Sequence, residues 1–357
     1  MGNTEICTTP EQLKGLGPFW DGLQTFLDAP FGKHRWVLSC AEAFAADSEL
    51  YVPVVRKDRV PVATAPLVKR RGFLGVVRQL GVEDHGEPGD FNYQDLESLD
   101  GLAMTLAERK VPLFLARVPE DSPVGGALRR AYRGRGLVIL RPQVNCPFIE
   151  IGVTESQTLD NLPARLRSDL RRGRRKAETI GAISLEVHAP STVSDLTPLW
   201  EESLRIEATG WKGRRHTALQ LDHRVGSFYR AYAVRACEQG VLRIFFLRIG
   251  GKMTAMMIGL EVSERLWILK IGYDENFAAC SPGMILIHEI LRYAAQRKLK
   301  SYEFLGTATA WTRRWTKQER KILRIYVYPY TGKGAAILAR DSVKYLWHKA
   351  YRPRKGR

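Results

Sequence analysis

The sequence lacks the segments that direct a chain into or across a membrane. None of its apolar runs reaches the roughly 18 residues needed to span a bilayer. The first seven residues, Met1 to Cys7, contain neither a basic start nor an apolar run, so we expect no secretory leader. Gly2 does not indicate myristoylation, because Ile6 stands where that signal requires Ser or Thr. These absences predict a cytoplasmic protein.

Cysteine and histidine are too scattered to predict a metal site or a disulfide framework. The five cysteines include no C-x-x-C pair, which indicates reduced thiols. None of the seven histidines lies in an H-E-x-x-H pattern, so we expect no metal. Gly15-Leu16-Gly17 begins like a dinucleotide fingerprint, but no third glycine follows and no strand precedes it. That motif is therefore set aside.

Acidic residues are outnumbered by basic ones. The chain has 55 Lys and Arg against 38 Asp and Glu, a net charge of +17 at pH 7. Such a charge attracts polyanions: cofactor phosphates, nucleic acid or an anionic membrane surface. Basic residues gather between Arg165 and Lys176, with Asp169 as the single acid, and again after Ala350 at Arg352, Arg354, Lys355 and Arg357. Either run can instead be a solvated face.

The pattern of apolar runs predicts an α/β protein, and 357 residues suffice for two domains. In the first half we expect helices over 18–27, 96–109 and 122–132, a hairpin over 50–68, and strands over 35–40, 73–80, 111–116 and 137–140. Later we expect helices over 155–180, 193–209, 225–239 and 335–351, and strands over 182–187 and 322–328. The helix over 155–180 places arginines three or four residues apart, so several share one face.

The stretch from Val241 to Leu305 is the most informative. Two apolar runs flank Gly250-Gly251, which predicts a β-hairpin with a two-residue turn. A strand over 266–272 follows, then Ser281 as a helix N-cap, a helix to about Arg297, and a strand over 301–305. The free N–H groups that begin a helix bind anions, and Gly283 would let a ligand approach the backbone. Ser-Pro-Gly is also an ordinary way to begin a helix.

Several segments resemble the acetyltransferase family named for the cellulose-biosynthesis proteins CelD and BcsL, a branch of the GNAT superfamily. The segments that carry the resemblance are Arg167 to Arg175, Glu207 through Gly213, Lys270 to Asp274, Ser281 to Gly283, and Glu303 to Leu305 with Trp315. Where the family continues with Gly-Asp and an aromatic-Lys pair, this chain has Thr307, Ala308, Trp311 and Thr312.

The resemblance implies two GNAT-like domains in tandem, with mixed central sheets flanked by helices. We expect residues 1–150 to form a mainly structural or acceptor-shaping domain, 151–330 to carry the acyl-CoA site, and 331–357 to form a basic helix and tail. It also implies acyl transfer from acetyl-CoA or another acyl-CoA to a sugar, a polysaccharide precursor or a similar small molecule.

Acyl transfer requires a polarised acyl carbonyl, a base for the acceptor and a proton for the leaving thiolate. The resemblance implies that a backbone N–H on a splayed strand polarises the carbonyl, and we place that strand at 253–262. Glu207 and Asp274 are the candidate bases, with Glu303 third, and Tyr273 is the candidate proton donor. Each has a plainer interpretation: a surface carboxylate, a turn residue, a strand residue and a packing aromatic.

We assign cofactor binding to Lys270, Ser281, Gly283 and Met284, and substrate binding to Trp211, Lys212, Glu303 and Trp311. Two other functions remain open. Peptidoglycan-bridge transferases resemble a doubled GNAT and use aminoacyl-tRNA, and the basic helix from Arg165 to Lys176 would suit tRNA phosphates or an anionic membrane. Alternatively, the departure at Thr312 and the lost Gly-Asp would mark a non-catalytic component of a polysaccharide synthesis complex.

Overall fold

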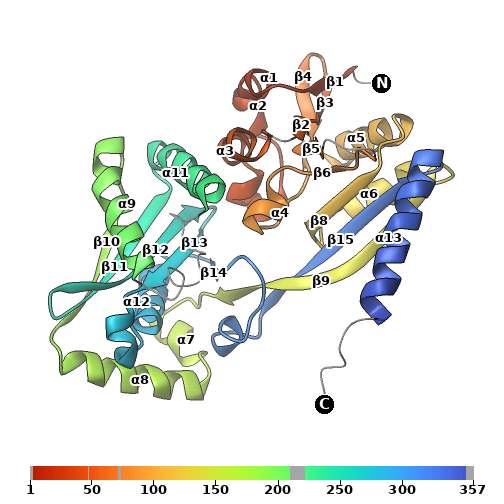
Figure 1. Cartoon of the computed structure of the whole chain (residues 1–357). Coiled ribbons are helices and arrows are strands. Elements are labelled where there is room, and N and C mark those ends of the chain that lie inside the picture. Colours follow the sequence, from red (N-terminus) through yellow and green to blue (C-terminus); the bar gives the residue numbers. More distant parts are fainter. Residues whose placement is uncertain (1–2, 47, 71–73, 210–221, 351–357) are drawn as a thin grey trace.

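Strands from both halves of the chain form one long mixed sheet (Figure 1). The computed structural model describes residues 3–46, 48–70, 74–209 and 222–350, and of 348–350 only the backbone. Its strands are β1 Asn3–Cys7, β2 Ser48–Leu50, β3 Val52–Lys57, β4 Val60–Thr64, β5 Leu67–Arg70, β6 Val77–Gln79, β7 Asn92–Tyr93, β8 Leu113–Pro119, β9 Gly136–Glu150, β10 Ile183–His188, β11 Leu242–Ile249, β12 Lys252–Val262, β13 Arg265–Tyr273, β14 Ser301–Glu303 and β15 Glu319–Pro329.

Helices cover both faces of the long sheet. The α-helices are α1 Pro10–Lys14, α2 Gly17–Trp20, α3 His34–Phe44, α4 Val82–His85, α5 Leu96–Glu108, α6 Val124–Ala131, α7 Glu155–Asp160, α8 Ala164–Glu178, α9 Val193–Ala208, α11 His223–Glu238, α12 Pro282–Gln296 and α13 Gly332–Ala350. Short 3-10 turns are η1 Phe26–Asp28, η2 Pro30–Gly32, η3 Glu275–Cys280 and η4 Thr312–Arg314. Among these described helices, none is both long and apolar enough to cross a bilayer.

The strand order of the long sheet is β10-β11-β12-β13-β14-β9-β15-β8-β6-β5-β2 in the described residues. Strand β9 joins the halves, because its last three residues pair with β14 while most of the strand pairs with β15. Strand β15 also pairs with β8, so a strand from the end of the chain lies in the sheet of the first half. It falls within the range 151–330 assigned above to the second domain, and the division of the chain into those domains stays a prediction.

The hydrophobic cores show how the halves pack. On one face of β10 to β13, helices α9 and α11 share a core with α1 and α3 of the first half. There Trp36 of α3 meets Phe228 of α11 edge to face, with ring centroids 4.9 Å apart. On the opposite face, α7, α8 and α12 form a separate core. The two halves are therefore held together on the α9 and α11 side of the second-half sheet.

Several predicted elements are confirmed, and the hairpin is the clearest. Strands β11 and β12 pair in antiparallel register, and Gly250 and Gly251 turn between them with φ of 57° and 78°. Positive φ at both positions is what a two-residue turn of this hand requires, and glycine adopts it without a Cβ penalty. The strand over 266–272 and the helix after Ser281 are confirmed as β13 and α12.

Three predicted elements are wrong. The helix predicted over 18–27 ends at Trp20 as α2, and the short turn η1 follows only at Phe26–Asp28. Residues 35–40, predicted as a strand, lie in helix α3, where Trp36, Cys40 and Phe44 are buried at the four-residue spacing of a helix face. The predicted helix over 155–180 is two helices, α7 and α8, because Pro163 stands between them and cannot continue the hydrogen-bonding ladder. The second helix ends at Glu178 with Thr179 as its C-cap, before the predicted stop at Gly181, which has φ of 157°.

Candidate active site

The centre of the site is the point where β13 and β14 separate. The two strands pair in parallel over three residues each. Arg265 lies opposite Ser301 at the start of this pairing, and Trp267 lies opposite Glu303 at its end. Strand β14 then ends, and the chain turns away to bond with β9 through Phe304 N–H and the Pro147 carbonyl. Strand β13 continues to Tyr273, and in the described residues its pairing with β14 stops at Trp267. An extended ligand could lie where the two strands diverge.

This result corrects the position of the splayed strand, which we predicted at 253–262. Strand β12 occupies that range and is paired with β11 on one side and β13 on the other. Its backbone donors are therefore engaged in the sheet. The sequence pattern identified the correct hairpin but could not reveal which strand would lose its neighbour.

A β-bulge at Leu269 decides which side chains face the site. Opposite this bulge, Gly259 of β12 pairs with Ile268 and Ile258 pairs with Lys270. Lys270 faces α11, with its Nζ 4.3 Å from the centroid of the Tyr229 ring. Gly272 faces α9, where a Cβ would come within 3.2 Å of the Glu207 Cα. Tyr273 points to the opposite face and packs with the core of α12.

Glu207 and Lys270, both predicted as site residues, meet around a tyrosine that the sequence did not identify. Glu207 is buried on α9, with 2% of its surface exposed. Tyr229 is buried on α11, and burial, reinforced by the nearby acidic groups of Glu87, Cys40 and Glu207, raises the pKa of its phenol well above the usual range. The phenol therefore stays protonated and able to donate a hydrogen bond.

The first half of the chain adds an unpredicted acid to this cluster. Glu87 follows α4 and is buried, and its Oε2 accepts a hydrogen bond of 2.9 Å from the Gly306 N–H. Burial raises the pKa of the Glu87 carboxyl to about 7, although the Gly306 amide, Arg117 and Lys270 oppose the rise. A carboxyl with a pKa near neutrality exchanges a proton readily at physiological pH.

Two more first-half residues surround Glu87. The Nδ1 of His85 accepts the Glu87 N–H at 2.9 Å, and burial lowers the pKa of this imidazole to about 3, so it is neutral. Arg117 is buried on β8, and its Nη2 donates to the Gly306 carbonyl and to the Cys146 Sγ. No sequence pattern marked these residues, because they lie at the end of α4 and in β8, more than 100 positions from β13.

The start of α12 differs from the prediction in its details. Ser281 occupies the N-cap position, but it is left-handed at φ 54° and its side chain makes no capping bond. Its carbonyl accepts from the N–H groups of Met284 and Ile285. In the described residues, Gly283 is then the one first-turn amide without a backbone acceptor. Gly283 also lies beside the Tyr273 ring, which would stand 3.4 Å from a Cβ there.

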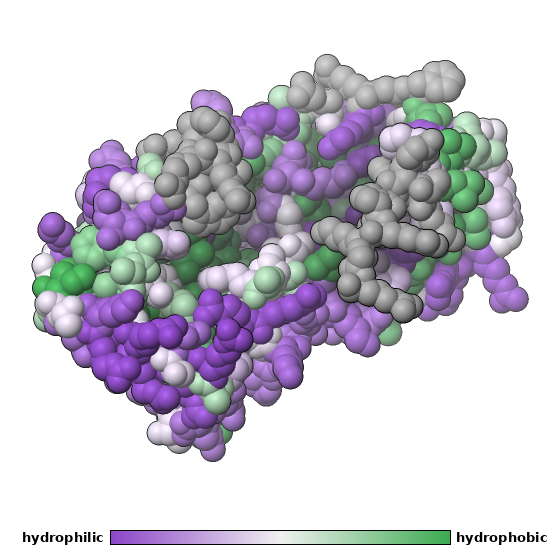
Figure 2. All heavy atoms as spheres, turned by 60° about the horizontal axis from the view of Figure 1, so that its bottom comes forward, coloured by the Kyte–Doolittle hydropathy of each residue, from purple (hydrophilic) through white to green (hydrophobic). Residues whose placement is uncertain are grey.

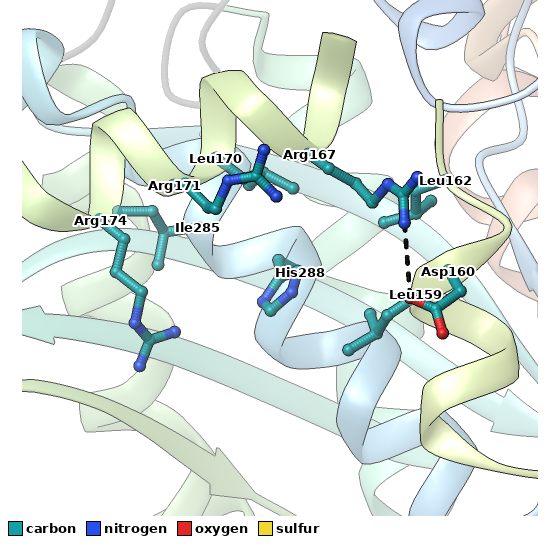
Figure 3. A pocket seen from close by; sticks show the side chains of 9 residues that line it. All are labelled: Leu159, Asp160, Leu162, Arg167, Leu170, Arg171, Arg174, Ile285 and His288. Carbon is teal, nitrogen blue, oxygen red and sulfur yellow. Dashed lines mark hydrogen bonds and ion pairs between the residues drawn. The ribbon is translucent and has the colours of Figure 1, made fainter. Parts of the chain in front are cut away.

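A basic pocket of about 190 Å³ lies between α8 and α12 (Figure 3). Arg167, Arg171 and Arg174 reach it from α8, and His288 reaches it from α12. Arg167 pairs with Asp160 at 3.4 Å, whereas Arg171 forms no ion pair with any side chain in the described residues. Figure 2 shows hydrophilic side chains gathered over the surface that α8 forms. The pocket therefore carries an excess of positive charge beside α12.

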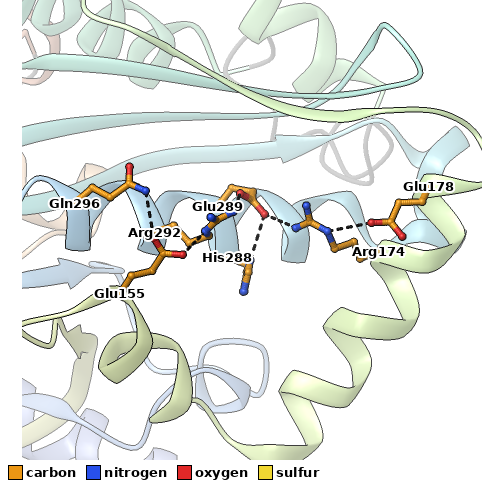
Figure 4. Close-up of polar contacts among 7 residues, drawn as sticks. All are labelled: Glu155, Arg174, Glu178, His288, Glu289, Arg292 and Gln296. Carbon is orange, nitrogen blue, oxygen red and sulfur yellow. Dashed lines mark hydrogen bonds and ion pairs between the residues drawn. The ribbon is translucent and has the colours of Figure 1, made fainter.

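The basic pocket is held in place by an ion-pair network (Figure 4). Glu289 of α12 bonds Arg174 of α8 at 2.6 Å and Arg292 at 3.0 Å. Burial alone would raise the pKa of Glu289, but hydrogen bonds from His288 and Arg174 outweigh it and lower the pKa to about 2. Arg292 also bonds Glu155 of α7 at 2.5 Å. This network fixes α7 and α8 against α12.

Helix α8 also contacts the loop before α12 directly. Gly173 lies where a Cβ would stand only 2.7 Å from the Cys280 carbonyl oxygen. The glycine that costs helix stability therefore permits the close approach of α8 to the residues that precede Ser281.

Other predicted site residues lie apart from the Glu87 cluster. Asp274 caps η3 by accepting from the Asn276 N–H at 3.0 Å. Glu303 is buried and bound to Arg320 of β15 and to the Ser301 hydroxyl. Trp311 is partly exposed and packs edge to face on Phe304. Trp211 and Lys212 lie outside the described residues.

The predicted cofactor residues divide between the two faces of β13. Tyr273, Gly283 and the start of α12 lie on one face, while Lys270 lies on the other with Tyr229. The point where β13 and β14 separate is between them.

The fold and the separation of β13 from β14 indicate the class of protein. Residues 164–313 match the family model described as an acetyltransferase (GNAT) domain. That segment is a GNAT-type acetyltransferase domain, and the chain is an acyltransferase. The predicted fold class, two GNAT-like domains in tandem with mixed sheets flanked by helices, is confirmed.

Solved structures resemble nearly the whole chain at low identity. The C-terminal domain of a protein described as a lysylphosphatidylglycerol synthetase from Agrobacterium fabrum is 13% identical, with a TM-score of 0.55, covering 94% of this chain and 96% of that one. FemX is 11% identical, with a TM-score of 0.56 and coverage of 92% and 97%. L-PGS from Bacillus licheniformis is 11% identical, with a TM-score of 0.53 and coverage of 89% and 92%. No curated protein matches the sequence.

Proposed function

We propose that the chain transfers an acyl group from an acyl-CoA to an amino or hydroxyl group of a sugar, a polysaccharide precursor or a similar small molecule. The observation that carries this proposal is the divergence of β14 from β13 after Trp267, together with the basic pocket beside α12. A pantetheine arm is an extended chain with amide groups, which suits a position between two diverging strands. A backbone N–H at this divergence would polarise the acyl carbonyl.

The basic pocket is the proposed site for the phosphates of the donor. Arg171 has no ion pair in the described residues, and Arg167 and His288 line the same space. Guanidinium groups bind phosphate oxygens through short charge-assisted hydrogen bonds. The pocket supports phosphate binding more strongly than the start of α12, where, in the described residues, only the Gly283 amide lacks a backbone acceptor.

Glu87 is the proposed base, with Glu207 as the second candidate. The acceptor would lose its proton to the carboxylate as its nitrogen or oxygen attacks the acyl carbon, and the carbon–sulfur bond then breaks. Tyr273 remains the candidate that returns a proton to the thiolate. It lies on the opposite face of β13 from Lys270 and Glu207, so base and proton donor would flank a thioester placed at the strand edge.

The finer assignment to the CelD/BcsL type, and with it a polysaccharide acceptor, rests on the sequence resemblance over Arg167 to Trp315. The donor is tested by isothermal titration with acetyl-CoA and with longer acyl-CoAs. We expect heat with at least one of them, and a loss of about tenfold or more in affinity on Arg171→Ala, since a phosphate contact is removed. Arg129→Ala, an exposed arginine on α6, is the matched control. Absence of binding with every acyl-CoA would overturn the proposal.

A second candidate donor is an aminoacyl-tRNA. The observation that favours it is the outer side of α8, where Arg165, Arg175 and Lys176 are exposed and form no ion pair with a described side chain. Filter binding of aminoacylated tRNA across a salt series would test it. This donor is favoured if affinity falls steeply with salt. The fall should be less steep in the double variant Arg165→Ala, Arg175→Ala. Binding of acetyl-CoA without tRNA binding favours the first.

A further inference from the structure

A groove of about 1060 Å³ lies between α13 and the first-half sheet. Helix α13 rests on the sheet near its start, where Ile337 is buried against Val76 and Tyr328. Further along the helix, Tyr345 and Leu346 line the groove instead and are 51% and 63% exposed. Figure 1 shows the helix lying alongside β9 and β15. Protein interiors are close-packed, so a gap this large beneath a packed helix marks a candidate ligand site.

The floor of the groove is a row of side chains from four adjacent strands. Arg78 of β6 lies opposite Phe114 of β8. Phe114 in turn lies opposite Tyr326 of β15, which lies opposite Ile139 of β9. All four line the groove, and Arg78 is already paired with Glu83 at 2.6 Å. This row therefore offers aromatic and aliphatic surface, and its one cation has a carboxylate partner.

Two residues further along both strands, Arg324 of β15 lies directly opposite Arg141 of β9, and both line the groove. Within the described residues, neither guanidinium of this arginine pair has a carboxylate partner. Arg324 Nη1 lies 3.4 Å from the Tyr326 hydroxyl, Nη2 can donate to the Gln143 amide oxygen at 2.8 Å, and Nε is buried without a hydrogen-bond partner. The Arg141 guanidinium lies 4.5 Å from the Tyr345 ring centroid. Like charges directly opposed on neighbouring strands destabilise a sheet, and a bound anion would relieve that repulsion.

The other charges of the groove do not neutralise the arginine pair. Lys344 of α13 is exposed and lines the same space, without an ion pair to a described side chain. Asp341 is the one acid among the described residues that line the groove. Its carboxylate is already bonded by Arg340 at 2.8 Å and by the Tyr328 hydroxyl at 3.2 Å. The arginine pair and Lys344 therefore remain for a ligand.

A phosphate monoester fits these three cations better than a carboxylate does. It carries a charge of about −1.5 to −2 at neutral pH and three strong acceptor oxygens, whereas a carboxylate has one charge and two oxygens. A guanidinium that lies over a ring keeps its in-plane donors free for such oxygens. The row from Phe114 to Ile139 lies beside the cations and would contact an apolar group attached to the phosphate.

Single-stranded nucleic acid is a poorer match, although it also carries phosphates. Bases bind such proteins by stacking on open aromatic faces. The Phe114 ring has the guanidiniums of Arg78 and Arg324 at 4.7 Å and 5.5 Å from its centroid. Arg141 lies between the Tyr326 and Tyr345 rings, at 5.7 Å and 4.5 Å from their centroids. The ring faces are therefore engaged by arginines.

We propose that this groove binds a phosphate monoester with an apolar tail, the phosphate held by Arg141, Arg324 and Lys344 and the tail against Phe114 and Tyr326. The site is distinct from the basic pocket on α8. The proposal does not depend on the identity of the acyl donor.

Isothermal titration of the full chain with hexyl phosphate tests the proposal. The Arg171→Ala variant is titrated in parallel, so that binding at the basic pocket on α8 is separated from binding in the groove. We expect both proteins to bind hexyl phosphate at least about tenfold more tightly than inorganic phosphate, because the tail buries apolar surface. Hexanol, which has the tail without the charge, should give no measurable binding. Arg141→Gln should weaken hexyl phosphate binding about tenfold or more, because a charge-assisted contact is removed.

Thermal unfolding gives a second readout and shows whether the variant folds. Without ligand, Arg141→Gln should be at least as stable as the unaltered chain, because the opposed charges are removed. Hexyl phosphate should raise the unfolding temperature of the unaltered chain and leave that of Arg141→Gln in place. Arg129→Gln, an exposed arginine on α6, is the matched control and should respond as the unaltered chain does.

Four results would overturn the proposal. The first is equal hexyl phosphate binding by Arg141→Gln and the unaltered chain. The second is inorganic phosphate binding as tight as that of hexyl phosphate. The third is binding that only Arg171→Ala removes, which would place the ligand at α8. The fourth is Arg141-dependent binding of a thymidine oligonucleotide without any binding of hexyl phosphate.

Discussion

Glu87 in the first half accepts a hydrogen bond of 2.9 Å from the backbone amide of Gly306 in the second. This contact joins the loop after α4 to the residues that follow β14, close to where β14 stops pairing with β13. The first half was expected to be mainly structural or to shape the acceptor cleft. Its contribution of a buried carboxyl with a pKa near 7 makes it part of the candidate site.

Glu87→Gln tests whether this carboxyl is the base. Because its pKa is raised to about 7, the reactive carboxylate forms only as the pH rises through neutrality. Thiol release from acetyl-CoA with an amino sugar as probe acceptor should therefore rise up to about pH 7 and then level off. The variant should lose about a hundredfold or more in rate and lose that pH dependence.

Two further variants decide between the acids. Glu207→Gln is the alternative base variant, and Glu97→Gln, on the exposed side of α5, is the control that should keep full activity. Carbon NMR of labelled glutamate gives a readout independent of the acceptor. One carboxyl signal should titrate near pH 7, and that signal should be absent from the spectrum of Glu87→Gln. Persistence of that signal, or an unchanged rate profile, would refute the assignment.

Asp90→Asn should change how stability depends on pH. Burial raises the pKa of Asp90 from 3.8 to about 7, although hydrogen bonds from Ser122 and from the Phe91 N–H oppose the rise. The folded state therefore binds this proton more tightly than the unfolded state, and the free energy of unfolding falls as pH rises from about 4 to 7. The variant lacks this loss, which amounts to at most about 4 kcal/mol.

Urea unfolding near pH 5 and near pH 8 measures the effect. Glu87 titrates in the same window, so Asp90→Asn alone should reduce the pH slope and the double variant with Glu87→Gln should reduce it further. Glu108→Gln, an exposed acid at the end of α5, should leave the slope unchanged. An Asp90→Asn slope equal to that of the unaltered chain would contradict the prediction.

Gly173→Ala should destabilise the protein even though alanine favours a helix. The added Cβ would stand 2.7 Å from the Cys280 carbonyl oxygen, so α8 or η3 must shift. Such overpacking costs about 1 to 3 kcal/mol, more than the helix propensity of alanine returns. The matched control is Gly101→Ala on α5, where a Cβ meets nothing within 4 Å. It should stabilise by up to about 1 kcal/mol in chemical unfolding. Equal stabilisation by both changes would show that α8 does not approach η3 closely.

Glu303→Gln should reduce stability rather than catalysis. Its carboxylate is buried and bonded to Arg320 at 3.0 Å from Nε and 2.5 Å from Nη2. Losing one partner leaves a poorly compensated guanidinium, at a cost of about 2 to 4 kcal/mol. A double-mutant cycle with Arg320→Met should give a coupling energy above about 1 kcal/mol. Full stability with lost activity would instead support the substrate role predicted from the sequence.

Local patterns predicted much of the second half. Gly250-Gly251 indicated a hairpin because both turn positions need positive φ, and Pro282 marked the first residue of α12. Arg35 to Cys40 misled because a short apolar run does not distinguish a buried strand from a buried helix. Pro163 interrupted a basic helical pattern that looked continuous when only the spacing of arginines was considered.

The site was less predictable than the fold. Glu207 and Lys270 were identified from the resemblance, and they do lie together around Tyr229. Glu87, His85 and Arg117 could not be identified, because their roles arise from burial between segments far apart in the chain. The splayed strand was misplaced for the same reason: the end of β14 depends on its pairing with β9, which no local pattern encodes.

Strand β15 has a consequence for synthesis of the chain. It lies between β8 and β9, yet its residues, Glu319–Pro329, are translated long after those of both neighbours. The amino-terminal sheet must therefore keep an open gap between β8 and β9 until β15 has emerged from the ribosome. Termination upstream of this strand would release a nascent product with two exposed edges, prone to pairing with other chains.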